Sequence, residues 1–350
     1  MPRLPAEWES QSAVMLTWPH ADTAWAHQLA RVERLWTELA LAITRYQPLL
    51  VVCRDLRHRA NVRARLAAAG VPAVQVALAP SDDAWARDHG PITIIDAAGR
   101  PEMVDFRFNA WGGKCGWDLD DRITPTLHAA GAFGTLTLNT SPLTLEGGAI
   151  ETDGAGTLLA IARTIMDPER NPGWSKRACE SELTRRLGLR RFLWLEHGAL
   201  SGDDTDGHID TLARFCAPDT LCYVQSTDPG DPDHRELVKM EREIRALAQA
   251  DGRPYRLIPL PCPAPIYDPD DGHRLPASYA NFLMINGAVL MPTYADPADR
   301  LAADRLAGLF PSRVLLTLDC RPLIRQGGSL HCITMHLPRG VAIRGEPVIS

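Results

Sequence analysis

Short apolar runs rich in β-branched residues recur along the chain and predict β-strands. Each run is about as long as a strand and ends at Gly, Pro, Asp or Asn. The predicted strands cover residues 48–53, 73–78, 91–96, 135–139, 157–162, 192–195, 221–225, 257–260, 282–285, 288–291 and 314–318. Asn286-Gly287 lies between two of these runs and is a strong signal for a β-hairpin.

Longer stretches between the runs carry apolar residues at helical spacing. One stretch, residues 25–46, has Val32, Leu39 and Ile43 on one helical face. Gly70 and Gly188 follow two other stretches, where glycine is favoured at the end of a helix. The predicted helices cover residues 25–46, 54–69, 175–187, 233–250 and 297–309. Because helices alternate with strands, we expect a mixed α/β fold.

The composition is that of a globular protein with enough apolar material for a large core. The chain has 350 residues, of which 45% are hydrophobic and 23% are charged. No linker, charge block or low-complexity tract divides it. We therefore expect one continuous catalytic domain over residues 1–350.

Charge and hydropathy argue against several partners. The formal net charge is -6 and no stretch is strongly basic, so nucleic acid is not expected as a partner. The first residues, MPRLPAEWESQS, do not read as a signal peptide. No apolar run is long enough to cross a bilayer. We expect a cytoplasmic protein with no membrane partner.

The cysteines do not form a recognisable framework. The chain has 8 cysteines but no CxxC pair, which disfavours a structural zinc site or a disulfide scaffold. Neither GxGxxG nor a P-loop is present, so no nucleotide site is predicted. Any chemical role has to be argued for one cysteine individually, because most free cysteines are buried and inert.

Functional groups and glycines gather in five short segments. These are residues 82–91, Trp111-Gly112-Gly113-Lys114, Leu145-Glu146-Gly147-Gly148, residues 202–210 and residues 326–334. Each segment alone has an ordinary structural explanation. Cys332 could be a buried thiol beside a surface histidine, and Glu146 a solvated turn residue. Arg87 and Asp88 could form a surface ion pair of little energetic value.

The Gly207-His208-Ile209-Asp210 segment combines a base with a carboxylate. On a strand, His208 and Asp210 would project from the same face and supply a proton shuttle and an anchor for a cation. A solvated Asp-rich loop is one alternative. A metal site is another, but no HExxH, EF-hand loop or Cys/His cluster accompanies the segment.

Taken together, the segments fit chemistry on a guanidinium group. This group is planar and cationic, and carboxylates bind its N–H donors bidentately. Attack on its central carbon needs carboxylates to fix the plane, a histidine to move protons and a thiolate as nucleophile. The residues that could meet these needs are Asp88, Glu146, His208, Asp210 and Cys332.

The sequence resembles the agmatine deiminase family, also named after a bacterial peptidylarginine deiminase, in the guanidino-group-modifying superfamily. The resemblance covers nearly the whole chain, with the motifs in the family's order. The matching motifs are Leu4-Pro5-Ala6-Glu7-Trp8-Glu9, Thr17-Trp18-Pro19, Asp83-Ala84-Trp85-Ala86-Arg87-Asp88, Leu145-Glu146-Gly147-Gly148, residues 202–210, Ser278-Tyr279-Ala280-Asn281-Phe282 and residues 327–334.

This resemblance implies a five-bladed α/β propeller of the pentein type, with the active site in its central channel. It also implies a role for each matching residue. Cys332 corresponds to the nucleophile and His208 to the proton-transfer histidine. Asp88 and Asp210 correspond to the carboxylates that hold the guanidinium, and Glu146 to an acid supporting substrate and histidine. Trp85 corresponds to an aromatic wall, and Asp204 to an acid near the distal end of the substrate.

The implied reaction is hydrolytic deimination through a covalent cysteine thiouronium, without a metal or organic cofactor. With agmatine the products are N-carbamoylputrescine and ammonia, which leads to putrescine and the polyamines. Relatives commonly form dimers or tetramers, so a homodimer or homotetramer is expected.

Three departures from the family pattern lie in the parts that shape the ends of the substrate, while the catalytic set is unchanged. They are His20-Ala21-Asp22-Thr23-Ala24-Trp25, Gly327-Gly328-Ser329-Leu330 and Ile333-Thr334-Met335-His336-Leu337-Pro338. Free or peptide C-terminal arginine is the main alternative substrate, although the acidic run 203–206 favours a distal amine. An amidinotransferase and a non-catalytic cation-binding relative are further alternatives. A papain-like protease is disfavoured because its cysteine precedes its histidine.

Overall fold

The computed structural model describes residues 2–348, and within them one ββαβ unit occurs five times. In the unit formed by β10 (Ala213–Ala217), β11 (Thr220–Gln225), α8 (His234–Ala246) and β12 (Arg256–Pro261), the first two strands pair antiparallel. The second and third strands pair parallel, and the helix between them provides the crossover that parallel pairing requires.

The other four units repeat this pattern of one antiparallel and one parallel pair. They are formed by β4 (Ile92–Ile95), β5 (Pro101–Arg107), α5 (Ile123–Ala129) and β6 (Leu138–Thr144); β7 (Glu151–Thr152), β8 (Thr157–Ile161), α7 (Lys176–Leu187) and β9 (Arg191–Leu195); β15 (Leu283–Ile285), β16 (Ala288–Thr293), α9 (Ala298–Leu309) and β17 (Val314–Asp319); and β18 (Thr334–Pro338), β1 (Gln11–Thr17), α1 (Leu29–Thr44) and β2 (Leu49–Cys53).

The last unit joins the two ends of the chain. Its first strand, β18, comes from near the C-terminus and pairs with β1 from near the N-terminus. This sheet continues through α2 (Leu56–Ala68), β3 (Val74–Leu78) and β19 (Glu346–Pro347). Short elements complete the fold: α3 (Ala86–His89), α4 (Ala110–Gly113), α6 (Ala162–Ile165), β13 (Ile266–Tyr267), β14 (Arg274–Leu275) and α10 (Arg321–Ile324).

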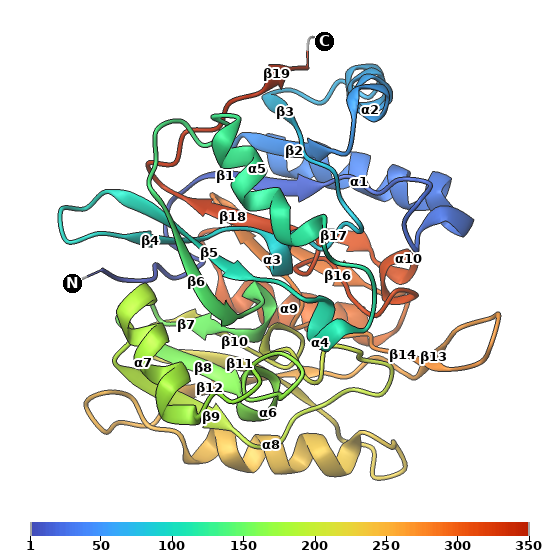
Figure 1. Cartoon of the computed structure of the whole chain (residues 1–350). Helices are drawn as coiled ribbons and strands as arrows, with labels where there is room; N and C mark the ends of the chain where they lie inside the picture. The colour runs from blue at the N-terminus through green and yellow to red at the C-terminus, as the bar shows by residue number, and fades with distance from the viewer. Residues whose placement is uncertain (1, 349–350) are drawn as a thin grey trace.

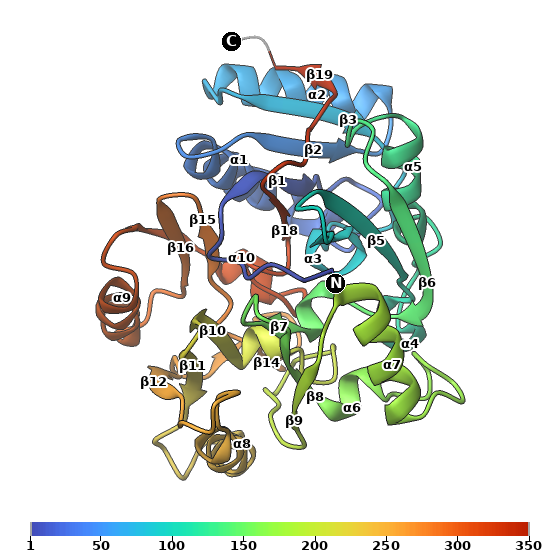
Figure 2. The same ribbon diagram turned by 90° about the vertical axis from the view of Figure 1, so that its left-hand side faces the viewer.

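The units form a five-bladed α/β propeller, as expected. The long helices α2 and α8 lie on the outside of the molecule, and the short helix α3 lies near its middle in both views (Figures 1 and 2). The first strands of neighbouring units touch: β7 contacts β10, and β4 contacts β18. The loops that enter these first strands are therefore brought together although they are far apart in sequence.

Most of the predicted elements are confirmed. The apolar face of α1 is buried, including Val32, Leu39 and Ile43. Gly188 ends α7 at a φ of 70°, the left-handed conformation that favours glycine. Asn286-Gly287 joins β15 to β16 in the expected antiparallel hairpin.

Of the strands longer than two residues, the pattern did not predict β1, β5, β10 and β18, and the run predicted at 135–139 is shifted to β6. Two of these strands carry polar residues that are buried or half-buried through pairing. Arg214 in β10 is fully buried against Glu151, and His336 in β18 lies 2.9 Å from an Arg87 guanidinium nitrogen. Because these strands carry paired polar residues, they lack the continuous apolar run on which the strand prediction depends. Among the helices of residues 2–348, none is both long and apolar enough to cross a membrane.

Candidate active site

The five residues predicted to carry the chemistry lie just before the first strand of a unit. Asp88 in α3 precedes β4, Glu146 precedes β7, His208 and Asp210 precede β10, and Cys332 precedes β18. The turns Gly147–Ala149 and Ile209–Thr211 contact each other, and the first also contacts α3. Four units therefore deliver these side chains to one place.

The possibility that residues 207–210 form part of a strand is wrong. His208 and Asp210 do not lie on a strand, because Ile209–Thr211 forms a single 3-10 turn before β10. Both side chains are nonetheless directed to the same centre. A Cβ atom added at Gly148 would lie 2.6 Å from His208 Nδ1, 2.9 Å from Asp88 Oδ1 and 3.1 Å from Asp210 Oδ2. Only glycine fits where these three groups converge.

His208 is buried between two carboxylates. Its Nδ1 lies 3.7 Å from Asp88 Oδ1, and its Nε2 lies 3.7 Å from Glu146 Oε2. Neither ring nitrogen has a hydrogen-bond partner within residues 2–348. Burial acts to lower the pKa of His208, but Asp88, Glu146 and Asp210 outweigh it and raise this pKa to about 9. The ring is therefore an imidazolium at neutral pH.

Asp88 is held by two donors and crowded by other acids. Its Oδ1 accepts a hydrogen bond from the backbone N–H of Gly148 at 3.1 Å, and its Oδ2 accepts one from Trp111 Nε1 at 3.1 Å. Burial, together with the charges of Asp210 and Glu146, raises the pKa of Asp88 to about 6. A cation bound beside Asp88 would therefore stabilise the ionised form of this carboxylate.

Asp210 is also buried, but its pKa is lowered and not raised. Its Oδ2 lies 2.6 Å from His331 Nδ1, while its Oδ1 is unpartnered within residues 2–348. Burial acts to raise the pKa of Asp210, but the contact with His331 and the positive charges of His208 and Arg214 lower it. The side chain is ionised at neutral pH and has one oxygen left for a ligand.

Glu146 is held in place by Arg170, which lies in none of the predicted functional segments. Buried Arg170 donates from Nε to Glu146 Oε1 at 2.8 Å, and from Nη2 to the carbonyl of Thr205 at 2.9 Å. Burial acts to raise the pKa of Glu146, but His208 and Arg170 lower it. Glu146 is thus a buried, ionised acid, and the solvated-turn alternative is wrong. The surface-pair alternative for Arg87 and Asp88 is also wrong, because both are buried.

The Cys332 thiol is buried beside these groups. Its Sγ lies 3.8 Å from Asp210 Oδ2 and 3.2 Å from Asn281 Nδ2. Burial and the negative charges of Asp210 and Asp88 raise the pKa of Cys332 well above its ordinary value, against a backbone hydrogen bond at Ser329 and the Asn281 amide. Without a ligand the sulfur is a neutral thiol at pH 7.

A small, narrow pocket opens onto the sulfur. We call it the tryptophan pocket, and it is lined by Trp85, Asp88, Trp111, Asp204, Thr205, Gln326, Gly327, Gly328 and Cys332. Asp83 fixes one wall, because its carboxylate accepts hydrogen bonds from Trp25 Nε1 at 2.7 Å and Trp85 Nε1 at 3.2 Å. A Cβ at Gly328 would lie 2.3 Å from the Trp85 ring, so glycine lets the ring sit against the backbone here. Asp204 is exposed.

Trp111 forms the second aromatic wall and was not predicted to do so. Its backbone has a φ of 56° and a ψ of 39°, a left-handed conformation that is strained for a large side chain. This conformation places the Trp111 ring centroid 6.2 Å from that of Trp85 and lets Trp111 Nε1 donate a hydrogen bond to Asp88. The Trp-Gly-Gly sequence was the available signal, since two glycines after a tryptophan indicate an unusual turn.

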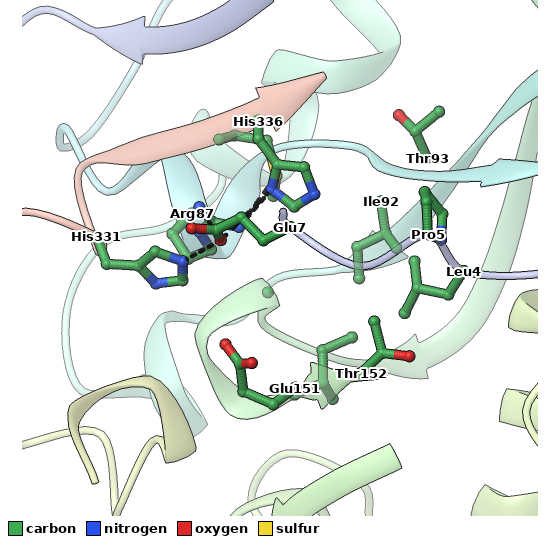
Figure 3. A pocket seen from close by; sticks show the side chains of 13 residues that line it. Leu4, Pro5, Glu7, Arg87, Ile92, Thr93, Glu151, Thr152, His331 and His336 are labelled. Atoms are coloured by element: carbon green, nitrogen blue, oxygen red, sulfur yellow. Dashed lines mark hydrogen bonds and ion pairs between the residues drawn. The ribbon is translucent and has the colours of Figure 1, made fainter. Parts of the chain in front are cut away.

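Beyond Asp210 lies a buried ion network of Glu7, Arg87, Glu151, Arg214 and His331. Glu7 Oε2 lies 2.7 Å from His331 Nε2, and Glu7 Oε1 lies 3.1 Å from Arg214 Nη2. Figure 3 shows Glu7 between His331 on one side and His336 on the other, with Arg87 beside the Glu7 carboxylate. Arg214 pairs in turn with Glu151. No role could be predicted for these residues, because local sequence does not reveal which charged side chains become buried.

The structure describes no group of three or more His, Cys, Asp or Glu side chains arranged to hold a metal ion in residues 2–348. The cysteines that it describes are free thiols. The groups that converge on Cys332 are instead carboxylates, an imidazolium and aromatic rings, which together suit a planar organic cation.

Known proteins are similar to this chain in both sequence and fold. The profile of the Porphyromonas-type peptidyl-arginine deiminase family matches residues 3–338. An agmatine deiminase of Stutzerimonas stutzeri is 32% identical, with 96% of this chain and 95% of that protein covered.

Two solved structures are similar over almost their whole length. A Porphyromonas gingivalis protein described as "Putative Arginine Deiminase" is 48% identical with a TM-score of 0.90, covering 98% of this chain and 100% of that one. A Cys-to-Ser variant of the Campylobacter jejuni agmatine deiminase with substrate bound is 32% identical with a TM-score of 0.89, covering 98% of each chain. On sequence and fold alike, the chain belongs to the agmatine deiminase family, the Porphyromonas-type peptidyl-arginine deiminases.

Proposed function

We propose that the protein hydrolyses agmatine to N-carbamoylputrescine and ammonia. The observation that carries the proposal is the convergence of Asp88, Glu146, His208, Asp210 and Cys332 on one small pocket. It contains two carboxylates for a guanidinium, an imidazolium for proton transfer and a thiol for attack. The agmatine deiminases of Stutzerimonas stutzeri and Campylobacter jejuni support this substrate by their similarity.

Substrate binding and thiol activation are coupled in this proposal. The guanidinium lies between Asp88 and Asp210, each of which has reason to bind a cation. Its positive charge offsets the two negative charges that raise the pKa of Cys332, so the thiol releases its proton to solvent once substrate is bound, while His208 keeps its own proton. The empty enzyme therefore keeps its sulfur protonated, and the cation itself favours the nucleophilic form.

The chemistry then proceeds in two steps. The Cys332 thiolate attacks the guanidinium carbon and forms a tetrahedral intermediate. His208, held as an imidazolium by Glu146 and Asp88, donates its proton to the departing nitrogen, and the C–N bond breaks to release ammonia. The neutral His208 next accepts a proton from water, which attacks the thiouronium carbon. The C–S bond breaks and the hydroxyl proton passes to solvent as the carbonyl forms, giving the urea product and the free thiolate.

The pocket opening favours an amine over a carboxylate at the distal end of the substrate. Asp204 is exposed and lines the pocket, and its neighbour Asp203 adds negative charge. The nearby cation, Lys114, is already engaged, since its Nζ lies 2.8 Å from Asp206 Oδ2. A free arginine would bring its carboxylate towards these acids. Arginine remains the second candidate because the similar Porphyromonas gingivalis protein carries an arginine deiminase name.

Ammonia release decides between these substrates. Purified enzyme is assayed with agmatine, arginine, a peptide ending in arginine and methylated arginines, alongside Cys332→Ala. We expect the highest kcat/KM with agmatine and no release by Cys332→Ala. No ammonia from any of the compounds would refute deimination, and preference for arginine would replace agmatine as the substrate.

A further inference from the structure

One of the five units contributes no residue to the proposed chemistry, yet it has a polar side chain at the corresponding place. Asp88, Glu146, His208 and Cys332 each precede the first strand of a unit. In the unit that begins with β15, the polar residue nearest before that strand is Asn281, two positions upstream of Leu283. Its side chain is completely buried and lies at the same centre.

Asn281 touches the reacting atom directly. Its Nδ2 lies 3.2 Å from Cys332 Sγ and 3.5 Å from the carbonyl oxygen of Asp210. The orientation of the amide is fixed by its other end: Oδ1 accepts hydrogen bonds from the backbone N–H groups of His331 at 2.8 Å and Cys332 at 3.4 Å. Because those two groups can only donate, the atom that faces them is the oxygen, which also lies 3.4 Å from Cys332 Sγ, and the NH₂ group is the end of the amide that can donate to the sulfur.

The loop that carries Asn281 is anchored on both sides. Ser278 Oγ donates to the carbonyl of Thr211 at 2.5 Å, and Tyr294 Oη donates to the carbonyl of Ser278 at 2.9 Å. The backbone carbonyl of Asn281 itself accepts from the N–H of His331 at 3.2 Å. The amide is therefore held against the nucleophile before any substrate arrives, as preorganised stabilisation requires.

We propose that Asn281 is a further catalytic residue, whose side-chain amide donates a hydrogen bond to the Cys332 thiolate. The inference rests on the proposed function. A neutral donor suits this place better than Lys or Arg, because a positive charge beside the sulfur would repel the guanidinium cation. Asn281 stabilises the sulfur when it first forms as a thiolate and again when it leaves the thiouronium.

The test is a pair of variants with a matched control. Asn281→Ala removes the donor, while Asn281→Asp keeps the oxygen that accepts from His331 but replaces the NH₂ group. Asn286→Ala is the control: Asn286 lies in the β15–β16 turn of the same unit, and its amide bonds both the N–H and the carbonyl of Gln11, at 3.0 and 2.8 Å. The control loses two hydrogen bonds without touching the sulfur.

Two readouts separate catalysis from folding. The first is kcat and KM for agmatine. We expect a fall in kcat of about 100-fold in both Asn281 variants, the size found when one preorganised donor is removed, with a much smaller change in KM. The second is the pH dependence of Cys332 alkylation by iodoacetamide, followed on the Cys332 peptide by mass spectrometry. We expect its midpoint to move to higher pH in both Asn281 variants, and neither readout to change in Asn286→Ala.

An alkylation midpoint that stays at the wild-type pH in both Asn281 variants would overturn the proposal, and so would a kcat reduced less than threefold. If Asn281→Ala does not fold, Asn281→Leu takes its place, because Leu is close to Asn in shape and brings neither a donor nor a charge to the sulfur. The alkylation experiment needs no turnover, so it can support or overturn the Asn281 contact even if wild-type enzyme releases no ammonia and the proposed function fails.

Discussion

The buried charges on the two sides of Asp210 differ in how completely they are paired. Towards the tryptophan pocket, both ring nitrogens of His208, one oxygen of Glu146 and one oxygen of Asp210 have no partner within residues 2–348. Towards the ion network, each oxygen of Glu7 has at least two partners. Buried polar groups without partners are costly, so they are retained where a ligand completes them.

Asp210 belongs to both sides and shows how they are connected. One oxygen is bound to His331, whose other ring nitrogen is bound to Glu7. The second oxygen is free for the substrate. The ion network thus orients and ionises Asp210 from behind, while the tryptophan pocket supplies the groups that react. The first side should govern stability, and the second should govern turnover.

Cys332→Ala should give the largest effect and should affect the pocket side alone. We expect kcat to fall by roughly a millionfold or below detection, as for other enzymes that lose their nucleophile. Binding of agmatine, measured by calorimetry, should remain because the carboxylates are intact. Cys179→Ala is the control, since this buried cysteine of α7 packs in the core and should be dispensable for turnover. Turnover by Cys332→Ala would contradict the assignment.

Glu7→Ala should break the ion-network side. Its removal leaves buried Arg87 without a carboxylate partner and takes one of two carboxylates from Arg214 and from His331, so the unfolding free energy should fall by about 3–5 kcal/mol. The control is Glu9→Ala in the same segment, where the partly exposed pair with Arg3 should contribute less than about 1 kcal/mol. Both are measured by urea denaturation. Equal losses in the two variants would mean that the ion network is not the stabilising side.

The sequence predicted the pocket side far better than the ion-network side. Asp88, Glu146, His208 and Cys332 sit in short motifs where reactive residue types adjoin glycines, and this signal survives in local sequence. Glu7 and His331 are 324 positions apart, and Arg170 and Glu146 are 24 apart, so their pairing depends on the finished propeller. The strands β10 and β18 were not predicted for a related reason: their polar residues are paired and buried only in the folded protein, so in the sequence they resemble loop residues. The fivefold architecture was expected only from the family resemblance, because the units share a topology and not a repeated sequence.

Acidification should weaken substrate binding through the pocket side. Asp88 has its pKa raised to about 6, so it becomes protonated and neutral as pH falls below 6, and its attraction for a cation is lost. His208, with a pKa of about 9, stays charged throughout this range, and Asp210, with a lowered pKa, stays ionised. In Cys332→Ala, agmatine affinity should drop up to about tenfold per pH unit below 6.

Calorimetry between pH 5 and 8 checks this prediction, with the Asp88→Asn, Cys332→Ala double variant as control. The double variant should bind agmatine weakly and without the change near pH 6. A slope that persists in it would assign the titration to another group and weaken the distinction between the two sides.

Asp204→Asn should give the smallest effect, because Asp204 lies exposed at the pocket opening and its charge is screened by water. If it reads the distal amine, KM for agmatine should rise by about threefold to tenfold with little change in kcat, since the reacting centre is untouched. The rise should shrink at high salt. The same substitution should lower KM for arginine, because it removes a repulsion from the substrate carboxylate. Steady-state kinetics with both substrates test this, and equal changes for the two would show that the opening does not discriminate between amine and carboxylate.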